Sequence, residues 1–112
     1  MLTDELQIYK DTYNLCKVLM AYNDKVPRTI RYGEYATAIK YAFHGLDILY
    51  KCNSDRSHRA AYLNEYIYYL LGVKNRIQLF ADTKKLSIRK ATNIVLLSNK
   101  VLKQATGWRN AS

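Results

Sequence analysis

Apolar residues recur at alternating spacings of three and four along four segments of the chain, over residues 3–23, 29–52, 56–82 and 87–106. This spacing is typical of helices that each bury one stripe of side chains, whereas strands would alternate at every second residue. Because the connections between the segments are short, neighbouring helices are expected to be antiparallel. The pattern therefore predicts an all-α, antiparallel up-down-up-down four-helix bundle, formed by one domain over residues 1–112.

Residues that favour helix ends stand at the boundaries of these segments. Thr3 and Ser87 are suitable N-caps for the first and last helices, and Ser54 or Asp55 is suitable for the third. Gly107 is expected to end the last helix, because glycine readily adopts the left-handed conformation found after many helix C-termini.

The same spacing predicts which side chains face the core. The expected core-facing positions are Leu6, Tyr9, Tyr13, Cys16 and Met20; Tyr32, Ala36, Ile39, Phe43, Leu46 and Tyr50; Ala60, Leu63, Ile67, Leu70, Lys74, Ile77 and Ala81; and Ile88, Ala91, Val95, Ser98 and Leu102. Among them, the residues expected to be buried are Leu63, Ile67, Leu70, Ile39, Phe43, Leu46, Val95 and Leu102.

The helices carry more apolar residues than one stripe needs. In the third helix, Tyr66, Val73 and Phe80 repeat at sevenfold spacing beside the expected core positions, and the first and last helices carry similar extra residues. A thick core is one interpretation. Contact with another subunit is the other, and we expect a homo-oligomer because small monomers rarely expose contiguous apolar patches.

The charge is distributed unevenly along the chain. Of the formal net charge of +9, almost all lies after Glu65, where nine Lys/Arg residues face one acid, Asp82. A field of this kind attracts polyanions such as RNA or DNA. The residues predicted to bind nucleic acid are Lys84, Lys85, Arg89, Lys100, Lys103 and Arg76. Tyr62 and Tyr69 share a helix face with Arg76 and are candidates for stacking on bases.

No arrangement of residues predicts catalysis or a cofactor. Cys16, Cys52, His44 and His58 lack the spacing of a zinc site, and Cys16 is expected in the core. Asp55, Ser57 and His58 lie within four residues, whereas catalytic triads assemble from separated segments. We therefore expect no enzyme, no cofactor and no metal.

The sequence also gives an expectation for the compartment. The first residues lack the basic and apolar regions of a signal peptide, and no apolar run is long enough to span a membrane. Two cysteines do not form a disulfide framework. A cytoplasmic protein without membrane contact is expected.

Short motifs near both ends give a resemblance to a known family. Val26, Pro27 and Arg28 form a hydrophobic-Pro-basic turn after the first helix, and Gly107 and Trp108 close the last helix. The order of these features resembles the four-helix-bundle proteins of the S23 group, and more closely the accessory variability determinant of diversity-generating retroelements. This chain differs in having Thr106 where a first glycine is usual, and in lacking a basic tail.

The resemblance implies a non-catalytic, pentameric protein with a basic surface. It would bind the retroelement's reverse transcriptase and nucleic acid, and it would support mutagenic cDNA synthesis. The alternative is an S23-type scaffold that acts through protein–protein contacts alone. Steep weakening of binding with salt would favour the nucleic-acid hypothesis.

Overall fold

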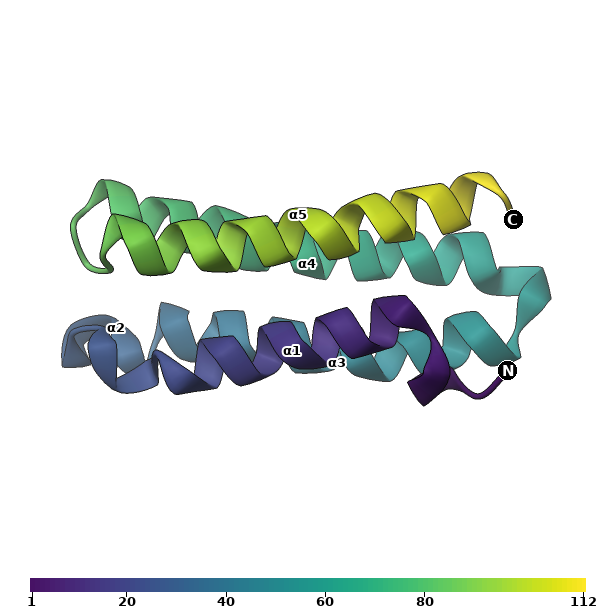
Figure 1. Ribbon diagram of the computed structural model, residues 1–112, viewed down its shortest axis with the longest axis horizontal. Helices are drawn as coiled ribbons and strands as arrows, with labels where there is room; N and C mark the ends of the chain where they lie inside the picture. Colours follow the sequence, from purple (N-terminus) through teal and green to yellow (C-terminus); the bar gives the residue numbers. More distant parts are fainter.

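The computed structural model describes all 112 residues. Four long helices form a bundle of 42 × 20 × 20 Å (Figure 1). They are α1 (Gln7–Ala21), α3 (Glu34–Ser54), α4 (Arg59–Asp82) and α5 (Ile88–Asn110), and a short α2 (Arg28–Arg31) connects α1 to α3. Single 3-10 turns cover Thr3–Glu5, Asn23–Lys25 and Arg56–His58, and no strand is present. Successive long helices are antiparallel, so the predicted all-α four-helix bundle is confirmed.

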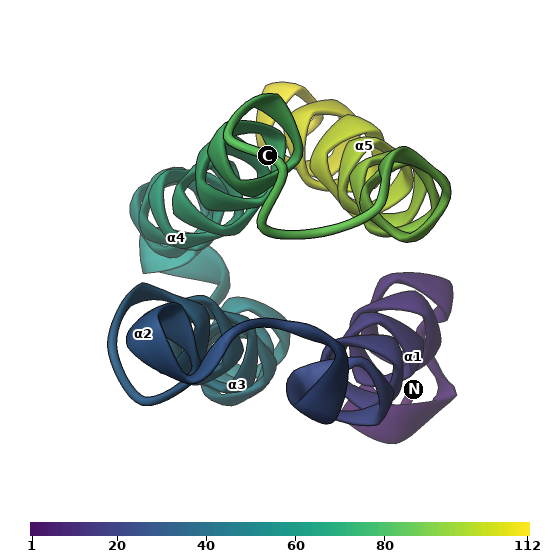
Figure 2. The same ribbon diagram turned by 90° about the vertical axis from the view of Figure 1, so that its left-hand side faces the viewer.

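The long helices stand at the corners of a square when the bundle is viewed along its axis (Figure 2). Both α1 and α4 pack against α3 and α5, so α1 and α4 face each other diagonally across the core. A buried hydrogen bond between the hydroxyls of Thr12 and Tyr66, 2.6 Å apart, crosses this diagonal. Burial raises the pKa of the Tyr66 phenol, which therefore stays protonated.

Two of the predicted N-caps form as expected. The Ser87 hydroxyl accepts a hydrogen bond from the Lys90 backbone N–H at 3.2 Å, and the Asp55 carboxylate accepts one from the His58 N–H at 3.3 Å. Each satisfies one of the backbone donors that a helix start leaves unpaired.

Three predictions about helix ends are wrong. Thr3 does not cap α1, because its hydroxyl instead accepts a hydrogen bond from the Asn53 amide at 3.0 Å. The segment expected as one helix over 29–52 is broken into α2 and α3 at Tyr32 and Gly33. Gly107 lies inside α5 with a negative φ, and the helix continues to Asn110.

The buried stripe of α4 agrees only in part with the predicted one. Leu63, Leu70 and Ile77 are buried as expected. Tyr66, Val73 and Phe80, for which a thick core and a subunit contact were both open, are buried in the core between them. Ile67 and Lys74 lie half-buried at the edge instead. The stripe with two aromatic rings buries more apolar area than the stripe that contains Lys74, and it leaves the ammonium group in water.

In the other long helices too, the buried positions are mostly one residue earlier in the chain than the predicted core positions. The buried residues include Ile8, Leu15 and Leu19 of α1, and Ile94 and Val101 of α5. Of the eight residues expected to be buried, Leu46, Leu63 and Leu70 are confirmed, whereas Ile39, Ile67, Val95 and Leu102 are half-buried and Phe43 is 41% exposed. Other predicted core residues that are exposed are Tyr13, Met20, Tyr32, Tyr50, Ala60 and Ile88.

Two glycines let α3 and α4 pack closely. A Cβ atom on Gly45 would lie 2.8 Å from Leu70 Cδ2, and a Cβ on Gly72 would lie 2.7 Å from Tyr41 Cδ2. Both distances are shorter than real contacts allow. The absence of a side chain at these positions therefore sets how near the two helices approach.

Candidate nucleic-acid interface

Helix α5 carries five basic residues, Arg89, Lys90, Lys100, Lys103 and Arg109, and no acid. Arg89, Lys100 and Lys103 are exposed, and their spacing places them on the side of α5 that points away from the core. Exposed asparagines and threonine share this side, which is polar apart from Leu96. We call Lys84, Lys85, Arg89, Lys100 and Lys103 together the α5 basic face.

The turn before α5 holds Lys84 in an unusual backbone conformation. Its φ of 60° is the only positive value in the chain. The turn closes with hydrogen bonds from the Lys85 N–H to Phe80 O (2.7 Å) and from the Lys84 N–H to Ala81 O (3.0 Å). This is the helix ending at which glycine is usual, because a non-glycine residue there costs roughly 1–2 kcal/mol. Lys84 and Lys85 are both exposed.

One member of the α5 basic face has an acidic partner. Lys100 Nζ lies 3.4 Å from Asp11 Oδ1, and the Asp11 carboxylate also accepts hydrogen bonds from Gln104 (2.8 Å) and Gln7 (3.0 Å). Burial alone would raise the pKa of the Asp11 carboxyl, but the hydrogen bonds and the Lys100 charge outweigh burial and lower it. This group fastens α1 to α5, so Lys100 contributes to folding as well as to the surface charge.

Arg76 lies apart from the α5 basic face. Its Nε donates to Glu34 Oε2 at 2.9 Å, its Nη1 donates to Gly72 O at 3.1 Å, and its guanidinium lies over the Tyr41 ring, 4.8 Å from the centroid. A cation with a carboxylate partner is a poorer phosphate contact than a free one. The prediction that grouped Arg76 with the lysines of the turn and α5 therefore finds no geometric support.

The two tyrosines expected to stack on bases are half-buried. The Tyr69 ring is packed between Tyr41 (4.9 Å between centroids), His44 (4.3 Å) and Tyr68 (5.3 Å). Tyr62 lies under Lys51 Nζ at 5.7 Å from its centroid. Sequence reasoning missed Tyr68, whose side chain is 66% exposed. Tyr68 lies on the side of α4 opposite the buried residues Tyr66, Val73 and Phe80. Its exposure could have been predicted once these residues, and not Ile67 and Lys74, were placed in the core.

The residues that carry the family resemblance have structural positions of their own. Pro27 precedes α2, and Arg28 begins it with an exposed side chain. Trp108 is half-buried near the end of α5, where the Arg59 guanidinium lies 5.1 Å from its ring centroid. Arg59 also donates from Nε to Cys52 O at 2.7 Å. It thus satisfies a carbonyl at the end of α3, a structural reason for a cation at this helix start.

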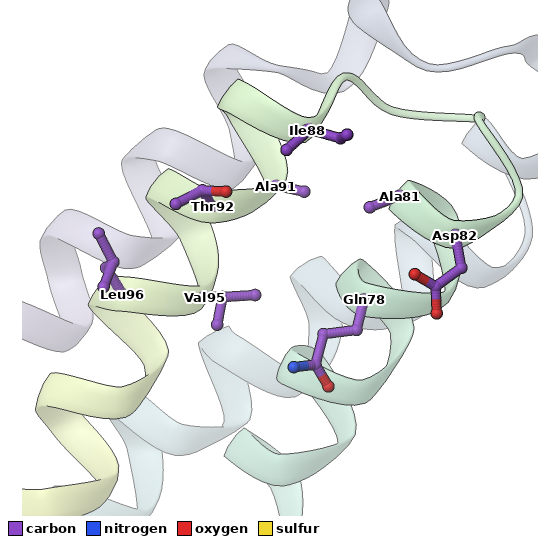
Figure 3. Close-up of a pocket in the computed structure, with 8 residues that line it drawn as sticks. All are labelled: Gln78, Ala81, Asp82, Ile88, Ala91, Thr92, Val95 and Leu96. Carbon is purple, nitrogen blue, oxygen red and sulfur yellow. The ribbon is translucent and has the colours of Figure 1, made fainter.

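An open apolar groove lies between α4 and α5 (Figure 3). Its volume is about 460 Å³, and it is lined by Gln78, Ala81, Asp82, Ile88, Ala91, Thr92, Val95 and Leu96. Ile88 is 76% exposed and Leu96 is 63% exposed at its margin. Apolar side chains lining an open groove of this kind are a feature of surfaces that meet another protein. Unlike the buried stripe of Tyr66, Val73 and Phe80, this groove is an apolar surface open to solvent.

The remaining reactive groups form no recognisable catalytic arrangement. Ser57 Oγ (3.1 Å) and Asp55 Oδ2 (2.9 Å) both approach the same nitrogen of His58, Nδ1, whereas a triad uses one ring nitrogen for each neighbour. Burial raises the pKa of Cys16 to about 12 and that of Cys52 to about 11, so both remain thiols. No group of three or more potential ligands is placed to hold a metal ion. No helix combines the length and hydrophobicity that a membrane span requires.

No protein-family model matches the chain, and no curated protein sequence matches it either. The resemblance described above therefore rests on the order of its short motifs.

Proposed function

We propose that this chain is a non-catalytic accessory protein that binds nucleic acid through the α5 basic face. The observation that carries the proposal is the absence of any acid on α5, combined with the outward position of Arg89, Lys100 and Lys103. Surface cations on globular proteins are usually interleaved with acids, so an unbalanced group points to an anionic partner.

The conformation of Lys84 supports the same interpretation. A glycine at this position would relieve the strain of the positive φ, yet the chain carries a lysine there. Strained residues gather at functional sites, where the side chain is needed more than local stability is. An exposed cation on the turn extends the line of charge from α5 around the end of the bundle.

The partner protein and the assembly are further parts of the proposal. The resemblance carried by Pro27, Arg28, Gly107 and Trp108 is the support for a reverse transcriptase as partner and for mutagenic cDNA synthesis as the process. A homo-oligomer is supported by the apolar groove beside Ile88 and Leu96, and the number five rests on the resemblance alone. A reverse-transcriptase gene beside this one, with a template and a variable repeat, would support the first part.

An S23-type scaffold remains the alternative function. It is favoured by the same apolar groove, and under it the α5 basic face would meet an acidic protein. Direct binding to purified RNA separates the two hypotheses, because a scaffold of this kind has no reason to bind RNA with a defined surface.

The test uses two triple variants with equal charge loss. The first replaces Lys85, Arg89 and Lys103 with Gln; these residues are exposed and make no ion pair within the chain. The second replaces Lys25, Lys40 and Arg56, which are also exposed and unpaired but lie outside the turn and α5. Circular dichroism checks that both variants remain folded.

We expect the first triple variant to bind a labelled hairpin RNA about tenfold or more weakly than the parent at moderate salt. The second should lose much less. Equal losses would mean that net charge alone attracts RNA, and no binding by the parent would leave the scaffold as the better function.

A further inference from the structure

A second surface pocket lies between α3 and α4, whereas the groove of Figure 3 lies between α4 and α5. Its volume is about 290 Å³, and it is lined by Tyr41 of α3 and by Tyr68, Leu71, Gly72, Asn75 and Arg76 of α4. Tyr68, Gly72 and Arg76 are four residues apart and therefore follow one another along a single helix face. Gly72 has no side chain, so the Tyr41 ring lies in the gap between the other two. The pocket thus has an aromatic floor with a ring at one end and a guanidinium at the other.

Arg76 is held as a fixed plane in this pocket. Glu34 and the Gly72 carbonyl each accept a hydrogen bond from it, and Tyr41 lies beneath it. A guanidinium fixed in this way stacks well on a flat ring. Because Glu34 already balances the charge of Arg76, we expect the flat guanidinium group, rather than its charge, to contact a ligand in this pocket.

Tyr68 offers the largest exposed ring surface in the pocket. It is 66% exposed and contacts Tyr69 nearly at a right angle, with an interplanar angle of 86°. A perpendicular contact of this kind covers at most one face of the Tyr68 ring, so the other face is available. Asn75, two helical turns further along α4, also lines the pocket and is exposed, and its amide supplies hydrogen-bond donors and an acceptor.

We propose that this pocket takes one unpaired base of single-stranded nucleic acid, stacked on Tyr68 with its edge toward Asn75. The volume is slightly below the 300–1,000 Å³ typical of small-molecule pockets, which suits a single planar ring system. Stacking on aromatic and arginine side chains is how proteins hold unpaired bases, whereas bases inside a duplex are not accessible to such a pocket.

This inference rests on the proposed function and names its ligand more closely. Tyr68 lies about 20 Å along the helix axis from the end of α4 at Asp82, and the turn with Lys84 and Lys85 follows directly. A strand with one base on Tyr68 therefore reaches the α5 basic face within a few nucleotides. The preferred ligand is a single strand, or a structured RNA with an unpaired tail.

The experiment compares Tyr68→Ala with Tyr68→Phe on two probes, an unstructured single-stranded RNA and a fully paired RNA duplex. Tyr68→Ala should weaken single-strand binding by about five- to one-hundred-fold, because stacking on one base is lost. Tyr68→Phe keeps the ring and should bind within about twofold of the parent. Duplex binding should be the same for the parent and both variants, and thermal midpoints should hardly change because the side chain is exposed.

A second variant separates a stacking plane from a phosphate contact at Arg76. Arg76→Lys keeps the charge and removes the plane. We expect it to weaken single-strand binding and to leave duplex binding unchanged. If Arg76→Lys binds the single strand as tightly as the parent, only the charge at this position matters, and the proposal that the Arg76 plane contacts the base is wrong.

The outcomes distinguish this inference from the function on which it rests. If the parent binds both probes and Tyr68→Ala binds the single strand as tightly as Tyr68→Phe does, the base pocket is wrong and the α5 basic face stands. If the parent binds neither probe, the proposed function fails and the base pocket fails with it.

Discussion

The side of the bundle where α3 meets α4, which we call the α3–α4 face, carries Glu34, His44, Glu65 and Arg76. It differs from the α5 basic face in how its charges are paired. On the first, Arg76 pairs with Glu34 at 2.9 Å and His44 lies 3.5 Å from Glu65. On the second, Lys100 alone has an acid within reach, Asp11. A cation whose charge is balanced inside the protein is less available to a phosphate, so pairing rather than number decides which side of a basic protein contacts phosphates.

The two faces also differ in packing. Gly45 and Gly72 carry no side chain, so the rings of Tyr66 and Tyr41 pack directly against the backbone at these positions between α3 and α4. On α5, by contrast, a Cβ atom added to Gly107 would have no neighbouring atom within 4 Å. Close packing therefore stabilises the α3–α4 face beneath its exposed pocket, whereas Gly107 on α5 makes no such packing contact.

The largest expected effect comes from matched glycine substitutions on the two faces. Gly45→Ala places a methyl group 2.8 Å from Leu70 and 3.2 Å from Tyr66, and overpacking of this kind costs about 1–3 kcal/mol. Gly107→Ala meets nothing and gains up to about 1 kcal/mol of helix propensity. Thermal unfolding should show a lower midpoint for the first and an equal or higher midpoint for the second. A lower midpoint for Gly107→Ala would mean that Gly107 ends the helix after all.

The extent of what the sequence predicted is clearest in α4. Helical periodicity identified the long helices, and Ser87 and Asp55 were recognisable caps because their chemistry is local. The choice between the stripe of Tyr66, Val73 and Phe80 and the stripe of Ile67 and Lys74 is not local, because both repeat every seven residues. Only the positions of the other helices decide which stripe is buried, although the lysine was a hint.

The candidate site shows a similar division. Its outward cations on α5 follow from helix phase and could be grouped from the sequence. The partners of Arg76 and Lys100 could not, because Glu34 and Asp11 lie 42 and 89 positions away along the chain. The exposure of Tyr68 depended on the correct core stripe and was missed for that reason.

The next prediction concerns Asp11, the ion-pair partner that distinguishes Lys100 from the unpaired cations of the α5 basic face. Asp11→Asn should lower the free energy of unfolding at neutral pH by about 1–3 kcal/mol, since hydrogen bonds to a charged carboxylate are lost. The folded-state pKa of Asp11 lies below its unfolded value, so its contribution is present above about pH 4 and disappears as the pH falls through the folded-state pKa. Urea unfolding at several pH values should show this loss in the parent and not in Asp11→Asn.

The control is Lys103→Gln, at an exposed, unpaired cation next to Gln104 on the same helix. It should leave stability unchanged at every pH while weakening RNA binding. Equal stability of Asp11→Asn and the parent at neutral pH would mean that the Lys100 pair is only a surface contact.

The smallest expected effect is at Lys84, where strain and charge can be separated. Lys84→Gly and Lys84→Ala remove the same charge, but only glycine relaxes the positive φ. We expect the glycine variant to be roughly 1 kcal/mol more stable than the alanine variant. Both should weaken RNA binding equally. A difference in binding between them would show that turn geometry, and not charge, is what the ligand uses.

The most direct test of the central claim is the salt dependence of RNA binding by the two triple variants. Replacing Lys85, Arg89 and Lys103 removes three phosphate contacts and should reduce the slope of log K against log salt by about 2 to 3 units. Replacing Lys25, Lys40 and Arg56 should leave the slope close to that of the parent, although the net charge falls by the same amount. Equal slopes for the two variants would contradict the assignment of nucleic-acid binding to the α5 basic face.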